Sequence, residues 1–360
     1  MKVCHFTSAH DSDDIRVFVK ECVTLASNGF EVYFVAPGSS RDDQGVKVVG
    51  IGNVPEGRLK RMTGFAKTAY RKAMELDCDI YHFHDPELLP YGLKLKKKGK
   101  TVIYDSHEDV PAQIMDKKWI PAFMRKMVSG WFRNYETRII KRLDAVVCAT
   151  PYIAEKMQGR ANNITVVNNF PKLDDIVYHE SPFASREGYI CYAGNISDDR
   201  GDTIMNDVMR SVDGKLIIAG EHDAVTNGNV EYIGKQNRAG VNDLYKESVL
   251  GLCILKPIDN YLNSQPIKMY EYMAAGLPFV CSDFPKWRKV AEESGAGVLT
   301  DPADISGTAK LLNSLLGDKD HLQEMGRKGR QYVISNCSWE NEGKKLTALY
   351  KGFSLGEVTA

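Results

Sequence analysis

The sequence is poor in the features that most readily assign a protein to a class. Its 360 residues carry no net charge, because 47 lysines and arginines balance 47 aspartates and glutamates. No apolar run approaches the length of a membrane span, and the N-terminus leads into a strand-like segment rather than a signal peptide. No G-x-G-x-x-G motif follows a predicted strand, so a nicotinamide-binding enzyme loses its main support. We expect a cytoplasmic protein, and nucleic acid is a poor partner because no basic face is interleaved with aromatic residues.

The eight cysteines form no C-x-x-C pair and no spacing typical of a metal site. Most of them lie in apolar runs that resemble buried strands, which indicates free thiols in a reducing compartment. Aspartate pairs of the D-x-D form occur at 11–13, 77–79 and 318–320, in polar loops or beside a helix end. We interpret these pairs as solvated acids and expect neither a metal nor a cofactor.

Short apolar runs alternate with segments of helical periodicity from one end of the chain to the other. The expected strands are 2–6, 31–35, 46–50, 79–84, 101–104, 144–148, 164–167, 189–193, 215–219, 230–233, 250–254 and 278–281. The expected helices include 14–28, 58–75, 87–97, 120–142 and 338–353. This alternation is typical of parallel sheets with helices on both faces. It predicts an α/β fold of two facing Rossmann-like domains with a cleft between them.

A polar stretch near the middle of the chain reads as a boundary between the domains. We expect a first domain over 1–170, a linker over 171–187 and a second domain over 188–336. A closing helix occupies the remaining segment, 337–360.

The segment 263–283 carries the densest motif of the chain. Ser264 is expected to cap a helix, and Pro266 suits its first turn. A helix N-terminus offers unpaired N–H groups and a positive dipole end, so it suits a phosphate. Lys268 adds a full positive charge there, and Glu271 can accept two hydrogen bonds from a vicinal diol such as a ribose. A diphosphate beside a ribose indicates a nucleotide.

The alternative is an ordinary amphipathic helix between two strands, which Gly276 would end as its C-cap. This reading explains the apolar residues of the segment. It does not explain why Lys268 and Glu271 occur together at a helix start that contains proline.

The segment resembles the donor-binding motif of family 4 glycosyltransferases, which are retaining enzymes of the GT-B fold. In that family two glutamates stand eight positions apart, and the second holds the donor ribose. Glu271 matches the second, and Asn263 stands in the place of the first. The resemblance covers nearly the whole chain and implies that the C-terminal helix crosses back onto the N-terminal, acceptor-binding domain. It implies these donor-binding residues: Gly194, Asn195, Arg200, Gly220, Glu221, Gly234, Lys235, Ser264, Pro266, Ile267, Lys268 and Glu271.

The start of the second domain contributes to the same implied site. A strand that ends at Gly194 lets a ligand approach the backbone closely, because glycine has no side chain. The family usually has an arginine next and a lysine later; here Asn195 replaces the first and Arg200 the second. The resemblance thus implies that Arg200 and Lys268 are the two cations on the donor diphosphate. The alternative is that Arg200 is a solvated charge at a helix start.

The first domain carries a His-Asp pair at the end of a predicted strand. The resemblance implies that His84 faces the reacting sugar as an acceptor-orienting group or proton shuttle, with Asp85 as its partner. A second acidic cluster ends the next strand, so His107 could reach the same place. The polar N-terminal loop replaces a glycine-rich loop of the family, and we expect His10 and Arg16 to shape the acceptor side.

Two helices of the first domain are strongly basic, and the stretch 117–142 also has an apolar side. That side consists of Met124, Met127, Val128, Trp131 and Tyr135. Contact with an anionic membrane is one hypothesis, which would place the protein on the inner face of the cell membrane. The other is that the apolar residues pack on the sheet while the charges face water.

Taken with the resemblance, these residues imply a retaining, metal-independent transferase. It would move a sugar from a UDP- or GDP-sugar to a lipid-linked saccharide in the synthesis of a surface polysaccharide, such as a capsule or exopolysaccharide. Two alternatives remain open. One is a nucleotide-sugar 2-epimerase of the same fold. The other is a non-catalytic nucleotide-sugar-binding subunit, suggested by Asn195 and Asn263.

Overall fold

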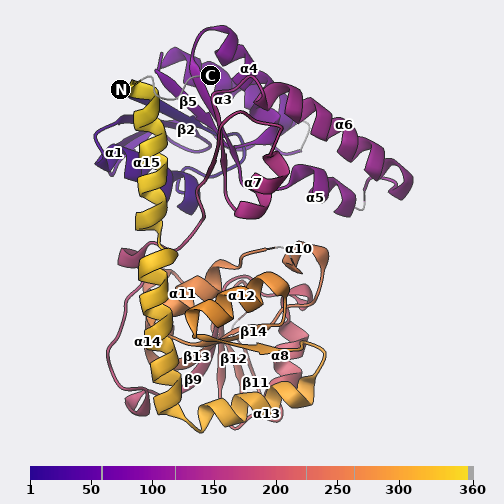
Figure 1. Ribbon diagram of the computed structural model, residues 1–360, viewed down its shortest axis with the longest axis vertical. Helices are drawn as coiled ribbons and strands as arrows, with labels where there is room; N and C mark the ends of the chain where they lie inside the picture. Colours follow the sequence, from indigo (N-terminus) through magenta and orange to yellow (C-terminus); the bar gives the residue numbers. More distant parts are fainter. Residues whose placement is uncertain (58–59, 118, 224, 263, 356–360) are drawn as a thin grey trace. The chain divides into compact units, whose positions relative to one another are not determined.

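The computed structural model describes residues 1–57, 60–117, 119–223, 225–262 and 264–355. It divides into two compact units (Figure 1). The first is Met1–Asn169 together with the residues from Asn341 on, and the second is Phe170–Glu340. Residues 171–187, which we expected as a linker, fall within the second unit.

The first unit is built on an eight-stranded sheet in the order β3-β4-β2-β1-β5-β6-β7-β8. All neighbouring strands are parallel except β3, which pairs antiparallel with β4. The strands are β1 (Lys2–Phe6), β2 (Glu31–Ala36), β3 (Arg41–Asp43), β4 (Val46–Gly50), β5 (Ile80–Phe83), β6 (Thr101–Ser106), β7 (Ala145–Cys148) and β8 (Ile164–Val166). The central strands are buried along nearly their whole length, because helices cover both faces of a parallel sheet.

The first helix of the first unit is a π-helix, an uncommon form. Asp14 caps the π-helix η1 (Ile15–Cys22) by accepting hydrogen bonds from the backbone nitrogens of Arg16 and Val17, both at 2.8 Å. The others are α1 (Val23–Ser27), η2 (Arg61–Phe65), α3 (Ala66–Glu75), η3 (Pro86–Leu88), α4 (Leu89–Lys97), α5 (Val110–Asp116), α6 (Ala122–Ile140) and α7 (Pro151–Met157). Figure 1 shows α6 extending away from the sheet with α5 beside it.

The second unit has a seven-stranded sheet in the order β11-β12-β10-β9-β13-β14-β15, parallel except for β11. Its strands are β9 (Tyr189–Ala193), β10 (Leu216–Ala219), β11 (Val225–Asn227), β12 (Val230–Tyr232), β13 (Ser248–Cys253), β14 (Phe279–Ser282) and β15 (Gly297–Thr300). Its α-helices are α8 (Asp202–Met209), α9 (Arg238–Glu247), α10 (Asp259–Leu262), α11 (Ile267–Ala275), α12 (Pro285–Ser294), α13 (Ile305–Leu316) and α14 (Lys319–Asn336). Three 3-10 helices precede β10: η4 (Leu173–Asp175), η5 (Phe183–Ser185) and η6 (Asp198–Arg200).

The C-terminal helix α15 (Trp339–Leu355) returns to the first unit, as the resemblance implies. The hydroxyl of Tyr350 lies 2.9 Å from Nε2 of His5 on β1 and 2.8 Å from Nδ1 of His82 on β5. Nearer the start of α15, Glu342 accepts a hydrogen bond from the backbone nitrogen of Asn168 at 2.9 Å. The two-domain α/β fold predicted from the alternation of elements is therefore confirmed.

Candidate functional site

Helix α11 of the second unit begins as the motif predicts but is capped differently. Pro266 is its N-cap residue, and Gly276 ends it in the left-handed conformation at φ 76°. Ser264, which we expected as the N-cap, is too far from the first turn. Its hydroxyl donates to the backbone oxygen of Tyr261 at 3.0 Å, so that prediction is wrong. No side chain caps the first turn of α11. Asn263 lies outside the described residues.

Lys268, in the first turn of α11, is a cation that forms no ion pair with any described acidic residue. Its ammonium group lies over the ring of Tyr192, 4.3 Å from the centroid. Burial lowers the pKa of Lys268, and the positive charge of Arg200 lowers it further. Within the described ranges Lys268 forms no hydrogen bond or ion pair. A partly buried cation in this state favours a negatively charged ligand.

Glycines bring the backbone of three strand ends together beside Lys268. The backbone nitrogen of Gly194 donates to Ala219 at 2.8 Å, and that of Gly220 donates to Gly234 at 3.1 Å. A Cβ on Gly194 would lie 2.9 Å from Nζ of Lys268, and one on Gly220 would lie 2.4 Å from the oxygen of Gly194. Gly194 has φ 130°, and a Cβ on Gly220 would clash with backbone, so both positions require glycine. The exposed side chains of Glu221 and Lys235 follow these turns.

Arg200 ends η6 at this edge of the sheet. Its Nη1 donates to the backbone oxygen of Asn195 at 3.3 Å, and the hydroxyl of Tyr192 donates to the same oxygen at 2.8 Å. Gly201 follows with φ 83°, and a Cβ there would lie 1.8 Å from the oxygen of Ile254. This close approach of Gly201 to Ile254 thus fixes the backbone position from which the Arg200 side chain extends. The structure brings Arg200, Lys268, Gly194 and Asn195 together.

Glu271 is held by Arg238, which no pattern in the sequence indicated. Nη2 of Arg238 donates to one carboxylate oxygen at 2.8 Å, and the hydroxyl of Tyr245 lies 3.4 Å from the other. The Glu271 side chain remains 13% exposed. Arg238 begins α9 directly after Asn237, which caps that helix by accepting from the nitrogen of Gly240. The cap signal at Asn237 was visible in the sequence, but nothing there indicated that Arg238 would meet α11.

In the first unit, His84 is fully buried and its partners differ from those predicted. Its Nε2 lies 3.0 Å from Nδ1 of His5, and its Nδ1 lies 3.5 Å from Asp105. Asp85 instead accepts hydrogen bonds from the hydroxyl of Thr7 at 2.7 Å and the backbone nitrogen of Ser8 at 2.6 Å. The predicted pairing of His84 with Asp85 is wrong, because successive side chains at a strand end point to opposite sides.

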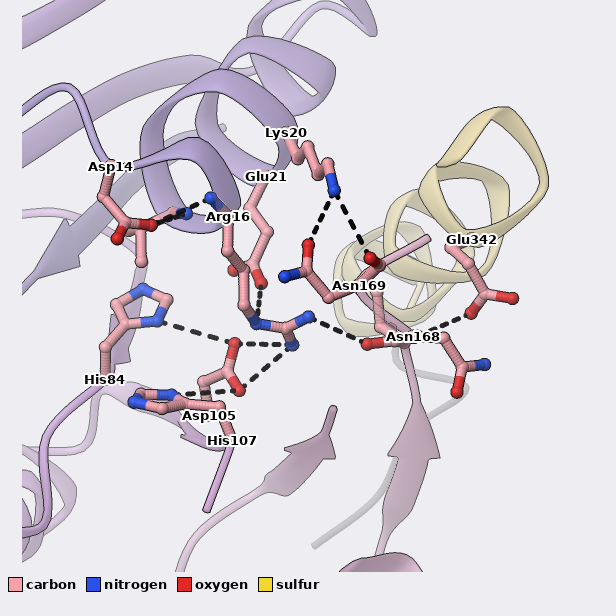
Figure 2. A network of polar contacts seen from close by, with 12 residues as sticks. Asp14, Arg16, Lys20, Glu21, His84, Asp105, His107, Asn168, Asn169 and Glu342 are labelled. Atoms are coloured by element: carbon pink, nitrogen blue, oxygen red, sulfur yellow. Dashed lines mark hydrogen bonds and ion pairs between the residues drawn. The ribbon is translucent and has the colours of Figure 1, made fainter. Parts of the chain in front are cut away.

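Arg16 is also buried and does not shape a surface. Figure 2 shows its guanidinium pointing toward Asp105 and Glu21, at 3.0 Å and 3.2 Å. Its Nη1 donates to the oxygen of Val167 at 3.0 Å. The cap formed by Asp14 starts η1 at Ile15 and turns Arg16 inward, which corrects the expectation that Arg16 lies on the acceptor side.

His10 and His107 are the two imidazoles of this group that solvent reaches. Their side chains are 26% and 19% exposed, and their Nε2 atoms lie 3.1 Å apart. Nδ1 of His10 lies 3.2 Å from Asp14, and its Nε2 lies 3.5 Å from Asp85. Although burial opposes it, these carboxylates raise the pKa of His10. Burial would also raise the pKa of Asp14, but the hydrogen bonds from His10 and Val17 lower this pKa to about 2.

The residues that directly follow His10 in the chain help to line a groove of about 570 Å³. It is lined by Asp11, Ser12, Asp13, Pro37, Gly38, Arg41, Asn53 and Val54. Arg41 fixes the loop on one side by donating to the hydroxyl and the backbone oxygen of Ser12, both at 2.8 Å. The aspartates of the first D-x-D string therefore face a hollow rich in hydrogen-bonding groups. Such a lining suits a polar, hydroxyl-bearing ligand.

Two family models match most of the chain. The one described as Glycosyltransferase Family 4 matches residues 16–174, and the one described as Glycosyl transferases group 1 matches residues 180–332. The spore coat protein SA of Bacillus subtilis (strain 168) is 30% identical over 83 residues, which is 23% of this chain. The matched segment spans only 22% of the length of that relative.

Several solved structures resemble nearly the whole chain. Sucrose-phosphate synthase from Thermosynechococcus elongatus is 15% identical with a TM-score of 0.76, covering 99% of this chain and 100% of its own. Anabaena HepE in complex with UDP and glucose is 12% identical with a TM-score of 0.69, covering 98% and 100%. WaaG, a glycosyltransferase involved in lipopolysaccharide biosynthesis, is 12% identical with a TM-score of 0.67, covering 96% and 98%. At these identities the likeness shows the fold.

Proposed function

Because the chain belongs to the family 4 glycosyltransferases of the GT-B fold, we propose that it transfers a sugar, with retention, from a UDP- or GDP-sugar to a lipid-linked saccharide. The synthesis of a surface polysaccharide, such as a capsule or exopolysaccharide, is the setting that this acceptor implies. The observation that carries the proposal is the unpaired Lys268 beside Arg200 at the glycine-lined edge of the second sheet.

We assign the donor diphosphate to Lys268 and Arg200, and the ribose to Glu271. Two cations and the first turn of α11 would stabilise the charge that develops as the diphosphate leaves, so this step needs no metal ion. Arg238 keeps the Glu271 carboxylate in place and leaves part of it exposed to accept from a diol. HepE, which resembles this chain, forms a complex with UDP and glucose.

The proposed transfer proceeds on one face of the donor sugar. The bond between the anomeric carbon and the donor phosphate oxygen breaks, and the acceptor hydroxyl oxygen bonds to that carbon. The hydroxyl proton passes to the departing phosphate, and the nucleoside diphosphate leaves. Retention follows because the acceptor arrives on the face from which the diphosphate departs. No carboxylate is assigned as a nucleophile in this scheme.

For the acceptor we assign the exposed imidazoles His10 and His107 and the groove lined by Asp11 and Asp13. These groups can orient sugar hydroxyls by hydrogen bonding. His84 and Asp85 lie behind them and would position His10 and the loop after β1 rather than touch the sugar.

A panel of UDP- and GDP-sugars tests the activity. We expect slow release of nucleoside diphosphate from one donor, and we expect Glu271→Ala to abolish most of it, because the ribose loses its acceptor. Chromatography of the nucleotide sugars separates the alternatives. Conversion of the donor into its 2-epimer without release would identify an epimerase. Binding of a donor, without turnover when lipid-linked saccharides are added, would identify a non-catalytic subunit.

Helix α6 presents an apolar face that does not pack on the sheet. Phe123, Met127 and Trp131 are 85%, 64% and 64% exposed, and Trp119 before the helix is 68% exposed. Their spacing of four residues places the three helical side chains on one face. The buried residues of α6 are Glu136, Ile139 and Ile140, near its C-terminal end. The second hypothesis, that the apolar side of this helix packs on the sheet, is therefore wrong for Met127 and Trp131, whereas Tyr135 does pack against the core.

We assign this apolar face, Trp119, Phe123, Met127 and Trp131, to an anionic membrane surface. Lys117, Arg125, Lys126 and Arg133 alternate with these residues in the sequence, and each cation near such a surface contributes about 1 kcal/mol. Tryptophan and phenylalanine between basic residues are typical of helices that lie in the lipid headgroup region. None of the helices in the described ranges is long and apolar enough to cross a bilayer. The proposed contact brings the enzyme to a lipid-linked acceptor.

Flotation with lipid vesicles tests the membrane contact. We expect the protein to float with vesicles containing phosphatidylglycerol and to stay behind with phosphatidylcholine alone. Phe123→Ser should weaken the binding about tenfold or more, because a buried phenylalanine contributes about 1.5–3 kcal/mol. Val225→Ser, which changes an exposed apolar residue of the second unit, should bind as the wild type does. Equal flotation of the wild type and Phe123→Ser would contradict the assignment.

A further inference from the structure

Four buried side chains of the first unit converge below the acceptor side. His5, Glu21, His82 and His84 each offer one ligand atom, and these atoms all lie within 4.8 Å of one another. All four residues are fully buried. The parallel register of β1 and β5 sets His5 beside His82, and His84 follows two positions later on the same side. We propose that these four residues bind one divalent transition metal ion, with Zn²⁺ as the best fit.

Neighbouring groups hold the three imidazoles so that one nitrogen of each faces the centre. The hydroxyl of Tyr350 contacts Nε2 of His5 and Nδ1 of His82, which leaves Nδ1 of His5 and Nε2 of His82 turned toward the cluster. Asp105 lies 3.5 Å from Nδ1 of His84, which leaves its Nε2. A ligand whose second nitrogen contacts a carboxylate or a hydroxyl is the usual arrangement around a metal site.

Nδ1 of His5 and Nε2 of His84 contact each other at 3.0 Å, whereas the other atoms that face the centre lack hydrogen-bond partners. Nε2 of His82 and both carboxylate oxygens of Glu21 are buried and have no hydrogen-bond partner among the described residues. A buried polar atom without a hydrogen-bond partner is destabilising, so three in one place call for a ligand. Arg16 lies 3.2 Å from Glu21 but is shared with Asp105. A cation at the centre would bind Nε2 of His82 and Oε2 of Glu21, while Oε1 of Glu21 stays beside Arg16.

The ligand set and its spacing select the metal. Bonds of about 2.0–2.1 Å in a tetrahedron place ligand atoms roughly 3.3 Å apart. Nδ1 of His5 is 3.0 Å from Nε2 of His84 and 3.8 Å from Glu21, so the observed distances bracket this value. Three imidazoles and one carboxylate suit Zn²⁺, whereas Mg²⁺ and Ca²⁺ prefer oxygen ligands. Four ligands from the protein indicate a structural site that joins β1, η1 and β5.

Metal analysis of the untagged, full-length protein tests this site. We expect about one zinc ion per chain by mass spectrometry after gel filtration. Growth with Co²⁺ should give the strong visible absorption of tetrahedral cobalt. Glu21→Gln and His82→Phe should reduce the bound metal at least tenfold, whereas His321→Ala, an exposed histidine on α14, should leave it unchanged.

Two outcomes would overturn the proposal, and neither needs the variants to fold. One is wild-type protein without metal whose melting temperature is the same after refolding with Zn²⁺ or with chelator. The other is bound cobalt with the weak spectrum of six-coordinate ions. If the variants fold and retain the full metal content, the site lies elsewhere and the assignment of these four ligands is wrong.

Discussion

Replacing Arg160 with methionine is expected to lower the free energy of unfolding by about 3–5 kcal/mol, because it leaves a buried carboxylate unpaired. Glu136 of α6 is 1% exposed, and one of its oxygens accepts from Nη2 of Arg160. Arg160 also donates to the hydroxyl of Thr137 at 2.8 Å and to the backbone oxygen of Arg133 at 3.2 Å. The pair therefore fixes the base of α6, the helix that carries the exposed apolar face. For a unit of this size the change corresponds to a melting temperature roughly 6–20 °C lower.

The pH dependence of this destabilisation distinguishes an unpaired charge from lost packing. Burial raises the pKa of Glu136 even with Arg160 present, and removing the arginine raises it further. When the pKa of a carboxyl is higher in the folded than in the unfolded protein, the folded protein loses stability as the pH rises from the unfolded pKa to the folded pKa. Arg160→Met should therefore be less destabilised near pH 5 than near pH 8. Thermal unfolding followed by circular dichroism measures the destabilisation at the two pH values.

A matched control lies on the same helix. Arg138 is exposed, so Arg138→Met should change the melting temperature little at either pH. Equal effects of Arg160→Met at both pH values would show that lost packing, rather than the charge of Glu136, causes the destabilisation.

The fold could be predicted because parallel strands covered on both faces are apolar throughout. Each of the twelve predicted strands has a counterpart in the structure, and central strands such as β5 and β13 are buried along their whole length. The short edge strands β3 and β11 were missed, because their three residues are polar or exposed and carry no periodicity. The strand β15 was also missed, since four residues that begin with glycine give too little signal.

The site was predictable only where neighbours in the chain are neighbours in space. Lys268 and the start of α11 follow from one helix signal. Arg238 meets Glu271 from 33 positions away, and the contact depends on how α9 packs beside α11. The histidine cluster depends on the register of β1 against β5, which local sequence patterns do not contain. Motifs therefore identify the chemistry of a segment, while packing decides which partners its side chains meet.

Lys268→Ala is expected to lower kcat/KM for the donor about 10- to 150-fold, which corresponds to one charge-assisted contact of about 1.5–3 kcal/mol. The loss should be large because Lys268 has no acidic partner in the described structure, so its charge is available to the diphosphate. Arg200→Ala should act in the same direction. The double variant should lose less than the sum of the two losses, since both cations contact one group.

The pH dependence of nucleoside-diphosphate binding tests whether the positive charge of Lys268 is what binds the diphosphate. Burial and the neighbouring Arg200 lower the pKa of Lys268, so its positive charge is lost at a lower pH than that of an ordinary lysine. Affinity measured by calorimetry should therefore fall as the pH rises through this lowered value. Lys268→Arg, which stays charged, should bind with little change over the same range. Lys310→Ala, an exposed lysine on α13, serves as the control and should match the wild type. An unchanged affinity in Lys268→Ala would move the diphosphate away from α11 and overturn the donor assignment.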